Sequence, residues 1–148
     1  MAEKKKKKKE VDDRFQKFGT VSFTSISKVN DFVSYLEQGR VMGTKCRKCG
    51  TVHFPPVADC AECLSSDIEW FEVSGPGKLV SWSKLSYAPV GFEEDLPYSI
   101  AILDYGDYKV FGRIAKDIPD EELAIGMAMK TEPITLPNGQ LSYTFTKP

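Results

Sequence analysis

The sequence predicts a mainly β protein with one N-terminal helix, a cysteine-rich ribbon and a small C-terminal barrel. Three observations support this fold class. Apolar residues follow a helical spacing before residue 40, two Cys-x-x-Cys pairs lie between residues 46 and 63, and short β-forming runs alternate with turn residues after residue 70. With 148 residues, the chain can form one compact domain or two small ones.

The first 13 residues are expected to form a disordered, lysine-rich tail. Lys4 to Lys9 are six consecutive lysines, which repel one another and bury no apolar surface. We favour a solvated tail. The alternative is a tail that contacts RNA, acidic lipid or an acidic partner. The aromatic stretch that follows has no clear period, and it is expected to be an arm packed on a surface.

An amphipathic helix is expected before residue 40, so residues 14–40 are assigned to the arm and a docking helix. Val29, Phe32, Val33 and Leu36 follow the i, i+3, i+4, i+7 spacing of one helical face. Ser27 is the predicted N-cap and Gly39 the predicted C′ residue. Such a short helix is not stable alone in water, so its apolar face must dock on the chain's own core or on a partner.

After residue 70 the pattern is that of short strands, and residues 70–148 are assigned to a barrel. Strands are expected in "GKLVSWSKLSY", "YSIAILDY", "KVFGRIA", "AIGMAMKTEPIT" and "LSYTFT". Gly106-Asp107 marks one turn, and Asn138-Gly139 predicts a type I′ hairpin. Five strands favour the oligonucleotide/oligosaccharide-binding (OB) barrel, although spacing alone does not separate it from an SH3-like barrel.

All four cysteines of the chain form two Cys-x-x-Cys pairs within residues 41–69: Cys46 with Cys49, and Cys60 with Cys63. Two such knuckles provide the four sulfur ligands of a closed tetrahedral zinc site, or of iron in a rubredoxin-like variant. Two disulfides or a redox pair are the less favoured alternatives. Because a closed site has no open coordination position, the metal is expected to be structural and not to activate water.

Residues for independent catalysis are not evident. His53 is the only histidine, and it could act as a ligand or a general base, but a histidine on the knuckle surface is favoured. Glu93, Glu94 and Asp95 form a clustered acidic loop and not a separated acid/base pair. We therefore predict that this chain contains no catalytic residues.

The charge distribution argues against nucleic acid as the main ligand. From Trp70 to Pro148, seven Lys/Arg stand against eleven Asp/Glu, a balance of −4, whereas nucleic-acid binding depends on neutralising phosphates. The locally basic segment contains Arg40, Lys45, Arg47 and Lys48. No apolar run is long enough to span a membrane and no signal peptide is evident, so a cytoplasmic protein is expected.

Five segments in order resemble one known family: "EQGR", "KCRKCGTVHFPP", "CAECLSS", "IEWFEVSGPGKLVSWS" and "AIGMAMK". This is the family of zinc-ribbon/OB-fold acyl-CoA-associated proteins. The resemblance covers about Val29 to Phe145 and implies an N-terminal helix, a rubredoxin-like zinc ribbon and a five-stranded OB barrel. It also implies that Cys46, Cys49, Cys60 and Cys63 bind structural zinc.

Members of that family are non-catalytic subunits of thiolase-fold enzymes, so the resemblance implies a thiolase-fold partner in a hetero-oligomer such as a heterotetramer. The four basic residues Arg40, Lys45, Arg47 and Lys48 then become candidate contacts for CoA phosphates or for the partner, with a solvated surface as the equal alternative. Where members often have a basic residue after the two prolines, this chain has Val57, which weakens a direct role in CoA binding.

Within the family, the chain is similar to the zinc-binding subunits of thiolases that act on benzoylsuccinyl-CoA in anaerobic toluene degradation. Two alternatives remain open. The partner is a thiolase-like aldolase or a hydroxymethylglutaryl-CoA synthase assembly, or the chain is a single-stranded nucleic-acid-binding OB protein. In that last case Trp82, Tyr87, Phe92, Tyr105 and Tyr108 would stack on bases.

Overall fold

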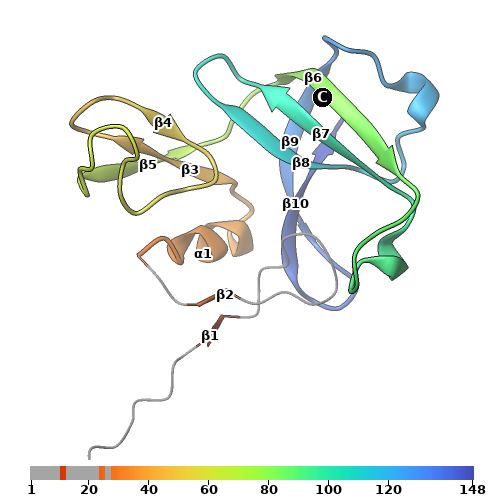
Figure 1. Ribbon diagram of the computed structural model, residues 1–148, viewed down its shortest axis with the longest axis horizontal. Helices are drawn as coiled ribbons and strands as arrows, with labels where there is room; N and C mark the ends of the chain where they lie inside the picture. The colour runs from red at the N-terminus through yellow and green to blue at the C-terminus, as the bar shows by residue number, and fades with distance from the viewer. Residues whose placement is uncertain (1–10, 13–23, 26–27) are drawn as a thin grey trace, which may run out of the picture.

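A short helix, a three-stranded sheet and a closed barrel follow one another along the chain (Figure 1). The computed structural model describes residues 11–12, 24–25 and 28–148. The lysine run and most of the aromatic arm lie outside these residues, so the expectations for both remain predictions. Near them, strands β1 (Val11–Asp12) and β2 (Thr24–Ser25) pair in antiparallel fashion.

Helix α1 (Asp31–Glu37) buries three of the four residues of the predicted apolar face, while Val29 precedes the helix and is half-buried. Phe32, Val33 and Leu36 are buried, and α1 packs against strands of both the ribbon and the barrel. Gly39 is the C′ residue as predicted, with φ +79°, and its N–H donates to the Leu36 carbonyl. The N-cap prediction was wrong: the helix begins after Asn30, three residues later than a cap at Ser27 requires.

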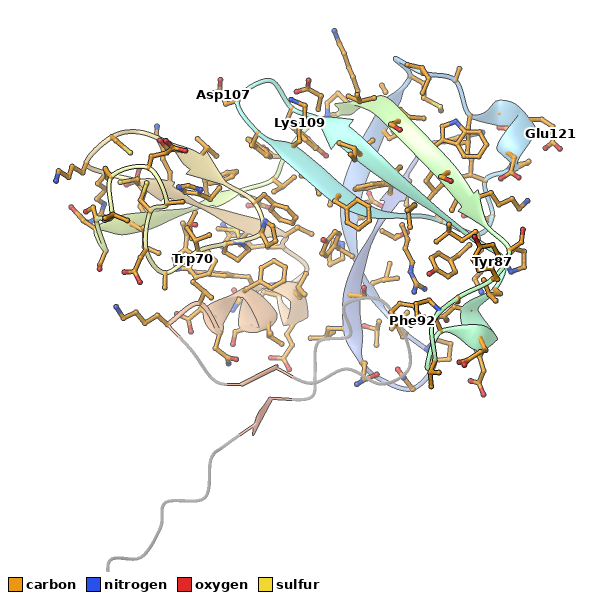
Figure 2. The ribbon with its side chains drawn as sticks, in the orientation of Figure 1. Trp70, Tyr87, Phe92, Asp107, Lys109 and Glu121 are labelled. Carbon is orange, nitrogen blue, oxygen red and sulfur yellow. The ribbon has the colours of Figure 1, made fainter. Side chains whose placement is uncertain are left out.

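The ribbon is an antiparallel sheet in the order β4–β3–β5. Its strands are β3 (Met42–Cys46), β4 (Val52–His53) and β5 (Ile68–Glu72). Gly43 lies in the central strand, directly beneath the Phe71 ring, where a Cβ atom would come within 2.5 Å of that ring. Figure 2 shows Trp70 of β5 between the ribbon and α1, and its ring centre is 5.2 Å from that of Tyr35.

Five strands form a closed barrel in the order β10–β8–β7–β6–β9, which closes through the pairing of β9 with β10. They are β6 (Gly77–Leu85), β7 (Tyr98–Asp104), β8 (Lys109–Ile114), β9 (Ala128–Thr135) and β10 (Leu141–Thr146). β8 and β10 are parallel, and the other neighbours are antiparallel. Two 3-10 turns, η1 (Glu93–Asp95) and η2 (Asp120–Glu122), lie in the connections.

This strand order distinguishes the OB barrel from the SH3-like alternative that the sequence left open. The first barrel strand pairs with the second and the fourth, and the third pairs with the fifth in parallel, as in the OB fold. The predicted five-stranded OB barrel is therefore confirmed. The pair formed by β8 and β10 is the one parallel pair of the barrel.

The β9–β10 hairpin differs from its predicted type. A type I′ turn needs positive φ at both central residues, but in this turn only Gly139 has positive φ, at +81°. The Gly139 N–H donates to the Leu136 carbonyl, which leaves Pro137 and Asn138 at the centre of the turn. Proline favours the type I turn at this position, and the glycine then takes the left-handed conformation that follows it.

Aromatic side chains join the helix, the ribbon and the barrel into one core. Phe54 follows β4, and its ring contacts Phe32 of α1 at 6.4 Å and Tyr143 of β10 at 5.6 Å between ring centres. On a second side, Phe71 of β5 contacts Tyr108 of the β7–β8 hairpin at 4.9 Å. The relative position of ribbon and barrel is thus fixed by side-chain packing on two sides.

Candidate metal centre

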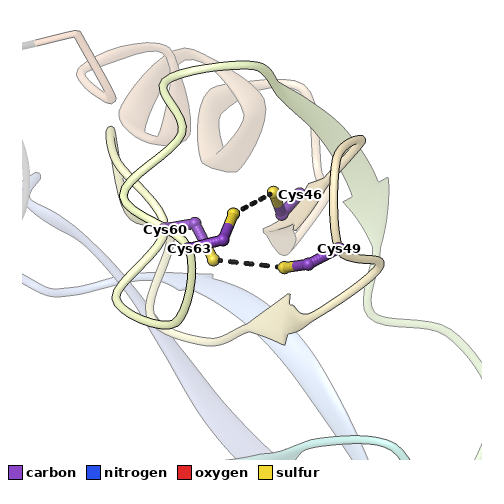
Figure 3. Close-up of side chains that lie close together, drawn as sticks. All are labelled: Cys46, Cys49, Cys60 and Cys63. Atoms are coloured by element: carbon purple, nitrogen blue, oxygen red, sulfur yellow. Dashed lines mark hydrogen bonds between the residues drawn. The ribbon is translucent and has the colours of Figure 1, made fainter.

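The two knuckles of the ribbon bring all four cysteine sulfurs together (Figure 3). Cys46 ends β3, Cys49 lies in the turn before β4, and Cys60 and Cys63 lie in the second turn, before β5. Cys46 Sγ is 3.5 Å from Cys63 Sγ, and Cys49 Sγ is 3.5 Å from Cys60 Sγ. All four sulfurs lie within 4.8 Å of one another.

The two knuckles have the same backbone hydrogen bonds. Gly50 N–H donates to the Cys46 carbonyl and Leu64 N–H to the Cys60 carbonyl, each at 2.9 Å. The residue after each pair has positive φ, +79° at Gly50 and +55° at Leu64. Leu64 is the only non-glycine residue with positive φ among the described residues, and its side chain is 83% exposed. The second knuckle therefore holds a strained leucine where the first has a glycine.

The four sulfurs fit a tetrahedral metal ion. With Zn–S bonds of ~2.3 Å, a regular tetrahedron has sulfur atoms about 3.8 Å apart, close to the separations of the two short pairs. Disulfides need an S–S bond of ~2.05 Å, so the four thiols are free in this arrangement. Both pairs lie in turns of the ribbon and neither begins a helix, which also argues against the redox motif.

The thiols differ in acidity in the absence of a cation. The Thr51 hydroxyl and backbone N–H both hydrogen-bond the Cys49 sulfur and lower the pKa of that thiol to about 6. The Ser65 N–H lowers the pKa of Cys63, but burial and the three neighbouring sulfurs together outweigh it and raise that pKa to about 12. Four sulfurs this close cannot all ionise without a compensating positive charge.

His53 lies beside the cluster and not within it. Its Nε2 atom is 3.4 Å from Cys60 Sγ, and Cys60 is almost completely buried. The four sulfurs already provide a complete tetrahedral set, so the ring is placed as a neighbour of a ligand. The sequence alone did not indicate this contact, because His53 and Cys60 are seven residues apart.

Thr51 was also missed by sequence reasoning, although a signal for it exists. Each Cys-x-x-Cys pair is followed by a positive-φ residue and then a hydroxyl residue, in "CGT" and "CLS". Cys46 N–H donates to the Thr51 carbonyl and Cys60 N–H to the Ser65 carbonyl, each at 2.9 Å. The matched spacing identifies Thr51 and Ser65 as equivalent residues that close the two knuckles.

The four predicted basic residues fall into two groups. Arg40 Nε donates to Glu72 at 3.0 Å, and Arg47 pairs with Glu69 at 3.1 Å and Asp67 at 3.6 Å. Lys45 and Lys48 are exposed and have no ion pair in the described part of the chain. Of the four basic residues, only the two lysines therefore present a positive charge with no carboxylate partner among the described residues.

The acidic loop that the sequence indicated is exposed at two of its three carboxylates. Glu93 and Glu94 are exposed in η1, but Asp95 is only partly exposed and its Oδ2 lies 3.1 Å from Nη1 of Arg113. The Arg113 guanidinium also lies against two aromatic rings. Asp95 is thus a structural carboxylate that holds the loop against the barrel.

The aromatic residues considered for base stacking are mostly engaged. Tyr105 and Tyr108 stack on each other at 5.1 Å between ring centres, and Phe92 packs on Arg113. Trp82 is half-buried against the core, which leaves Tyr87, at 87% exposure, as the free ring of the five. None of the helices in the described part of the chain has the length and hydropathy of a membrane span.

Two family models match consecutive parts of the chain. Residues 34–69 match the "ChsH2, rubredoxin-like zinc ribbon domain", and residues 70–132 match the "ChsH2, C-terminal OB-fold domain". The chain is 35% identical over 92 residues to a DUF35 domain-containing scaffold protein of Methanocaldococcus jannaschii, covering 61% of this chain and 64% of the relative. The match thus spans just under two thirds of that relative.

Further similarities agree with these matches. A DUF35 domain-containing scaffold protein of Pyrococcus furiosus is 33% identical over 96 residues, which cover 65% of this chain and 70% of that protein. The benzoylsuccinyl-CoA thiolase subunit BbsA of Thauera aromatica is 34% identical over 62 residues, 42% of either chain. The solved structure of an "Ltp2-ChsH2(DUF35) aldolase" has a TM-score of 0.66 at 23% identity, covering 81% of this chain and 94% of the matched one, which supports the fold alone.

Proposed function

Because the chain belongs to the ChsH2 (DUF35) family of zinc-ribbon and OB-fold proteins, we propose that it is a non-catalytic accessory subunit. Its partner in this proposal is a thiolase-fold enzyme that acts on acyl-CoA, in a hetero-oligomer such as a heterotetramer. The observation that carries the proposal is the similarity to two proteins named scaffolds, at 33% and 35% identity.

The chemistry of the described residues supports an accessory role. A thiolase needs a free nucleophilic cysteine and an acid/base histidine. Here all four cysteines lie in the metal centre, and His53 contacts the sulfur of one of them. The partner must therefore supply the catalytic residues.

We propose that Cys46, Cys49, Cys60 and Cys63 bind one structural Zn²⁺. The three strands of the ribbon hold few of the buried apolar residues, so the ribbon depends on the metal for much of its stability. A zinc ion in a closed four-sulfur site contributes ~10–16 kcal/mol to folding in zinc-finger peptides. In this role the ion holds the two knuckles together and orients the exposed face of the ribbon.

Lys45 and Lys48 are proposed as the residues of the ribbon that meet CoA phosphates or acidic residues of the partner. Arg40 and Arg47 already pair with carboxylates of β5 and its approach, so contact with a phosphate would first have to break those pairs. Because residue 57 is a valine, the position after the two prolines adds no positive charge to those of the two lysines.

The acyl group is a finer proposal. The similarity to BbsA makes benzoylsuccinyl-CoA the first substrate to test. A thiolase-like aldolase, suggested by the name of the structural neighbour, and a hydroxymethylglutaryl-CoA synthase assembly are the alternative partners. A single-stranded nucleic acid is a weaker alternative, because the barrel is acidic and most of its aromatic rings are engaged.

The test uses a thiolase-fold subunit from the same organism, purified with and without the full chain. We expect a stable complex by size-exclusion chromatography with light scattering. Acyl-CoA thiolysis by the complex should exceed thiolysis by the partner alone, and the isolated chain should show no activity. Full activity and unchanged thermal stability of the partner without the chain would contradict an accessory role. Retro-aldol cleavage by the complex would instead identify an aldolase partner.

A further inference from the structure

His53 is held in one position by residues on both sides of it. It lies in β4 opposite Thr44 of β3, and Thr44 is completely buried. The next residue, Phe54, packs between Phe32 and Tyr143. The backbone at His53 is therefore fixed by strand pairing and by the aromatic core, and the half-buried ring is directed at the metal centre.

The ring meets one of the two sulfurs, those of Cys46 and Cys60, that have no other hydrogen-bond donor outside the cysteines among the described residues. Cys49 accepts from the Thr51 hydroxyl at 3.2 Å and from the Thr51 N–H, and Cys63 accepts from the Ser65 N–H. Among the described residues, His53 is the only group besides another cysteine that hydrogen-bonds Cys60 Sγ. Cys60 is 1% exposed, so water does not replace a missing donor there.

A buried thiolate needs hydrogen-bond donors or a cation to compensate its charge. The metal ion compensates part of it, and an N–H donor from the surrounding shell compensates more and fixes the direction of the ligand. The neutral imidazole with its proton on Nε2 is such a donor, at a distance of 3.4 Å that suits an N–H···S contact.

We propose that His53 is a positioning residue of the metal centre: its Nε2–H donates to the Cys60 thiolate and stabilises the zinc-bound form, and His53 is not itself a ligand. This inference rests on the proposed zinc occupancy. It goes beyond the four ligands, because it assigns the single histidine of the chain a role in metal affinity.

The test compares three full-length variants with the wild type. His53→Ala removes the donor, His53→Gln keeps an N–H donor at a similar reach, and Val52→Ala is the control. Val52 is the neighbouring half-buried residue of β4, and its side chain has no hydrogen-bonding group. Zinc affinity is measured by competition with a chromophoric chelator at fixed pH. Far-UV circular dichroism of each zinc-loaded form establishes that the variants are folded.

We expect His53→Ala to weaken zinc binding about 10- to 100-fold, the range typical of lost outer-shell partners. His53→Gln should recover most of the affinity, and Val52→Ala should leave it close to wild type. Equal zinc affinity of His53→Ala and wild type, or a loss in Val52→Ala or His53→Gln as large as that in His53→Ala, would overturn the positioning role.

Cobalt substitution gives an independent spectroscopic readout. If His53 donates to a thiolate, the His53→Ala form keeps the d–d bands of four-sulfur tetrahedral Co²⁺, and its sulfur-to-cobalt charge-transfer band moves to longer wavelength. A wild-type spectrum with the d–d bands of three-sulfur, one-nitrogen Co²⁺, and a change of these bands in His53→Ala, would show that His53 is a ligand and overturn the proposal. A wild-type chain that binds no stoichiometric zinc would overturn the zinc site as well. Activity of the partner enzyme enters neither measurement, so failure of the accessory role is detected separately.

Discussion

The guanidinium carbon of Arg113 lies 4.1 Å from the centre of the Tyr98 ring. The same group has Phe92 at 5.6 Å and Asp95 at 3.1 Å, so one β8 side chain holds three residues of the β6–β7 connection and of the start of β7. Within the described part of the chain, Arg113 Nε and Nη2 are buried without a hydrogen-bond partner, so the Asp95 carboxylate at Nη1 and the two ring faces together compensate the charge. Beyond this anchored part, Tyr87 and Val90 are exposed.

Arg113→Met should destabilise the protein by about 1–3 kcal/mol, because it leaves the Asp95 carboxylate partly buried without its cation and removes the stacked guanidinium. The free energy of unfolding from urea titration checks this. Lys109→Met is the control, since Lys109 forms an exposed ion pair with Asp104 at 3.7 Å. A loss no larger than that of the control would contradict a stabilising role of the Arg113 contacts, and Arg113→Lys should recover only part of the stability.

Gly43→Ala is expected to destabilise the ribbon. The new Cβ atom would lie 2.5 Å from the Phe71 ring and 2.8 Å from the His53 carbonyl oxygen, and the second of these is backbone that cannot rotate away. We expect a loss of about 1–3 kcal/mol in the free energy of unfolding of the zinc-loaded protein. Ser83→Ala, at an exposed position of β6, should change it little. Equal stability of the two variants would show that the ribbon accommodates the methyl group.

Removal of the metal should unfold the ribbon. A strong chelator at neutral pH is expected to lower the melting temperature steeply, and Cys63→Ser should prevent stoichiometric zinc binding, because each of the four sulfurs is a proposed ligand. Asp59→Asn, on the same turn but outside the sulfur cluster, is the matched control. Metal analysis and differential scanning fluorimetry report the two effects. A chelated chain that melts like the zinc-loaded chain would contradict a structural metal.

Alkaline pH should destabilise the protein through Tyr143. Burial raises the pKa of this phenol well above its ordinary value, so the native state keeps the proton at a pH where the unfolded chain has lost it. The contribution of Tyr143 to the free energy of unfolding is therefore complete below pH ~10. It decreases as the pH rises above this value, by up to about 1.4 kcal/mol per pH unit.

The Tyr143→Phe variant tests this pH dependence. At neutral pH it should lose about 0.5–1.5 kcal/mol, because the hydroxyl donates to the Phe111 carbonyl at 2.9 Å. Between pH 9 and 11, however, its unfolding free energy should decline less steeply than that of the wild type. Tyr87→Phe, at an 87% exposed position, should follow the wild type. Parallel curves for Tyr143→Phe and wild type would exclude Tyr143 as the titrating group.

Charge reversal at the two unpaired lysines should slow association with the partner. Lys45→Glu/Lys48→Glu is expected to reduce the association rate about 3- to 10-fold at low ionic strength, with a smaller effect at high salt. Lys78→Glu/Lys116→Glu makes the same change of net charge at exposed positions of the barrel and is the control. Surface plasmon resonance against the purified partner checks the rates, and equal slowing in both pairs would indicate only a net-charge effect.

Much of the architecture follows from local patterns in the sequence. The spacing of Phe32, Val33 and Leu36 identified the buried face of α1, and Gly39 identified its end. The paired Cys-x-x-Cys motifs predicted the sulfur cluster, because the four residues and their spacing are sufficient to define two knuckles. These features depend on residues that are close in sequence, where periodicity and turn preferences are most informative.

The features that sequence reasoning missed depend on distant contacts or on competing turn types. The turn at Asn138 is not of the predicted type I′, because the preceding Pro137 favours type I. The Asn-Gly motif used for the prediction does not include this proline. The contacts of Arg113 with Tyr98 and of His53 with Cys60 join residues from different strands or turns, and no periodicity encodes them. The strain at Leu64 appears only when the second knuckle is built.

The aromatic contact of Phe54 with Phe32 and Tyr143 limits how this protein can be recombined. The ribbon is held by rings contributed from the helix before it and from the last strand of the barrel, so residues 41–69 are not an exchangeable module. A chimera that receives only a relative's ribbon would place a foreign side chain between two native rings. Successful exchange of ribbons among relatives should therefore require joint transfer of the helix and the matching β10 residue, which links their evolution across more than a hundred positions of the chain.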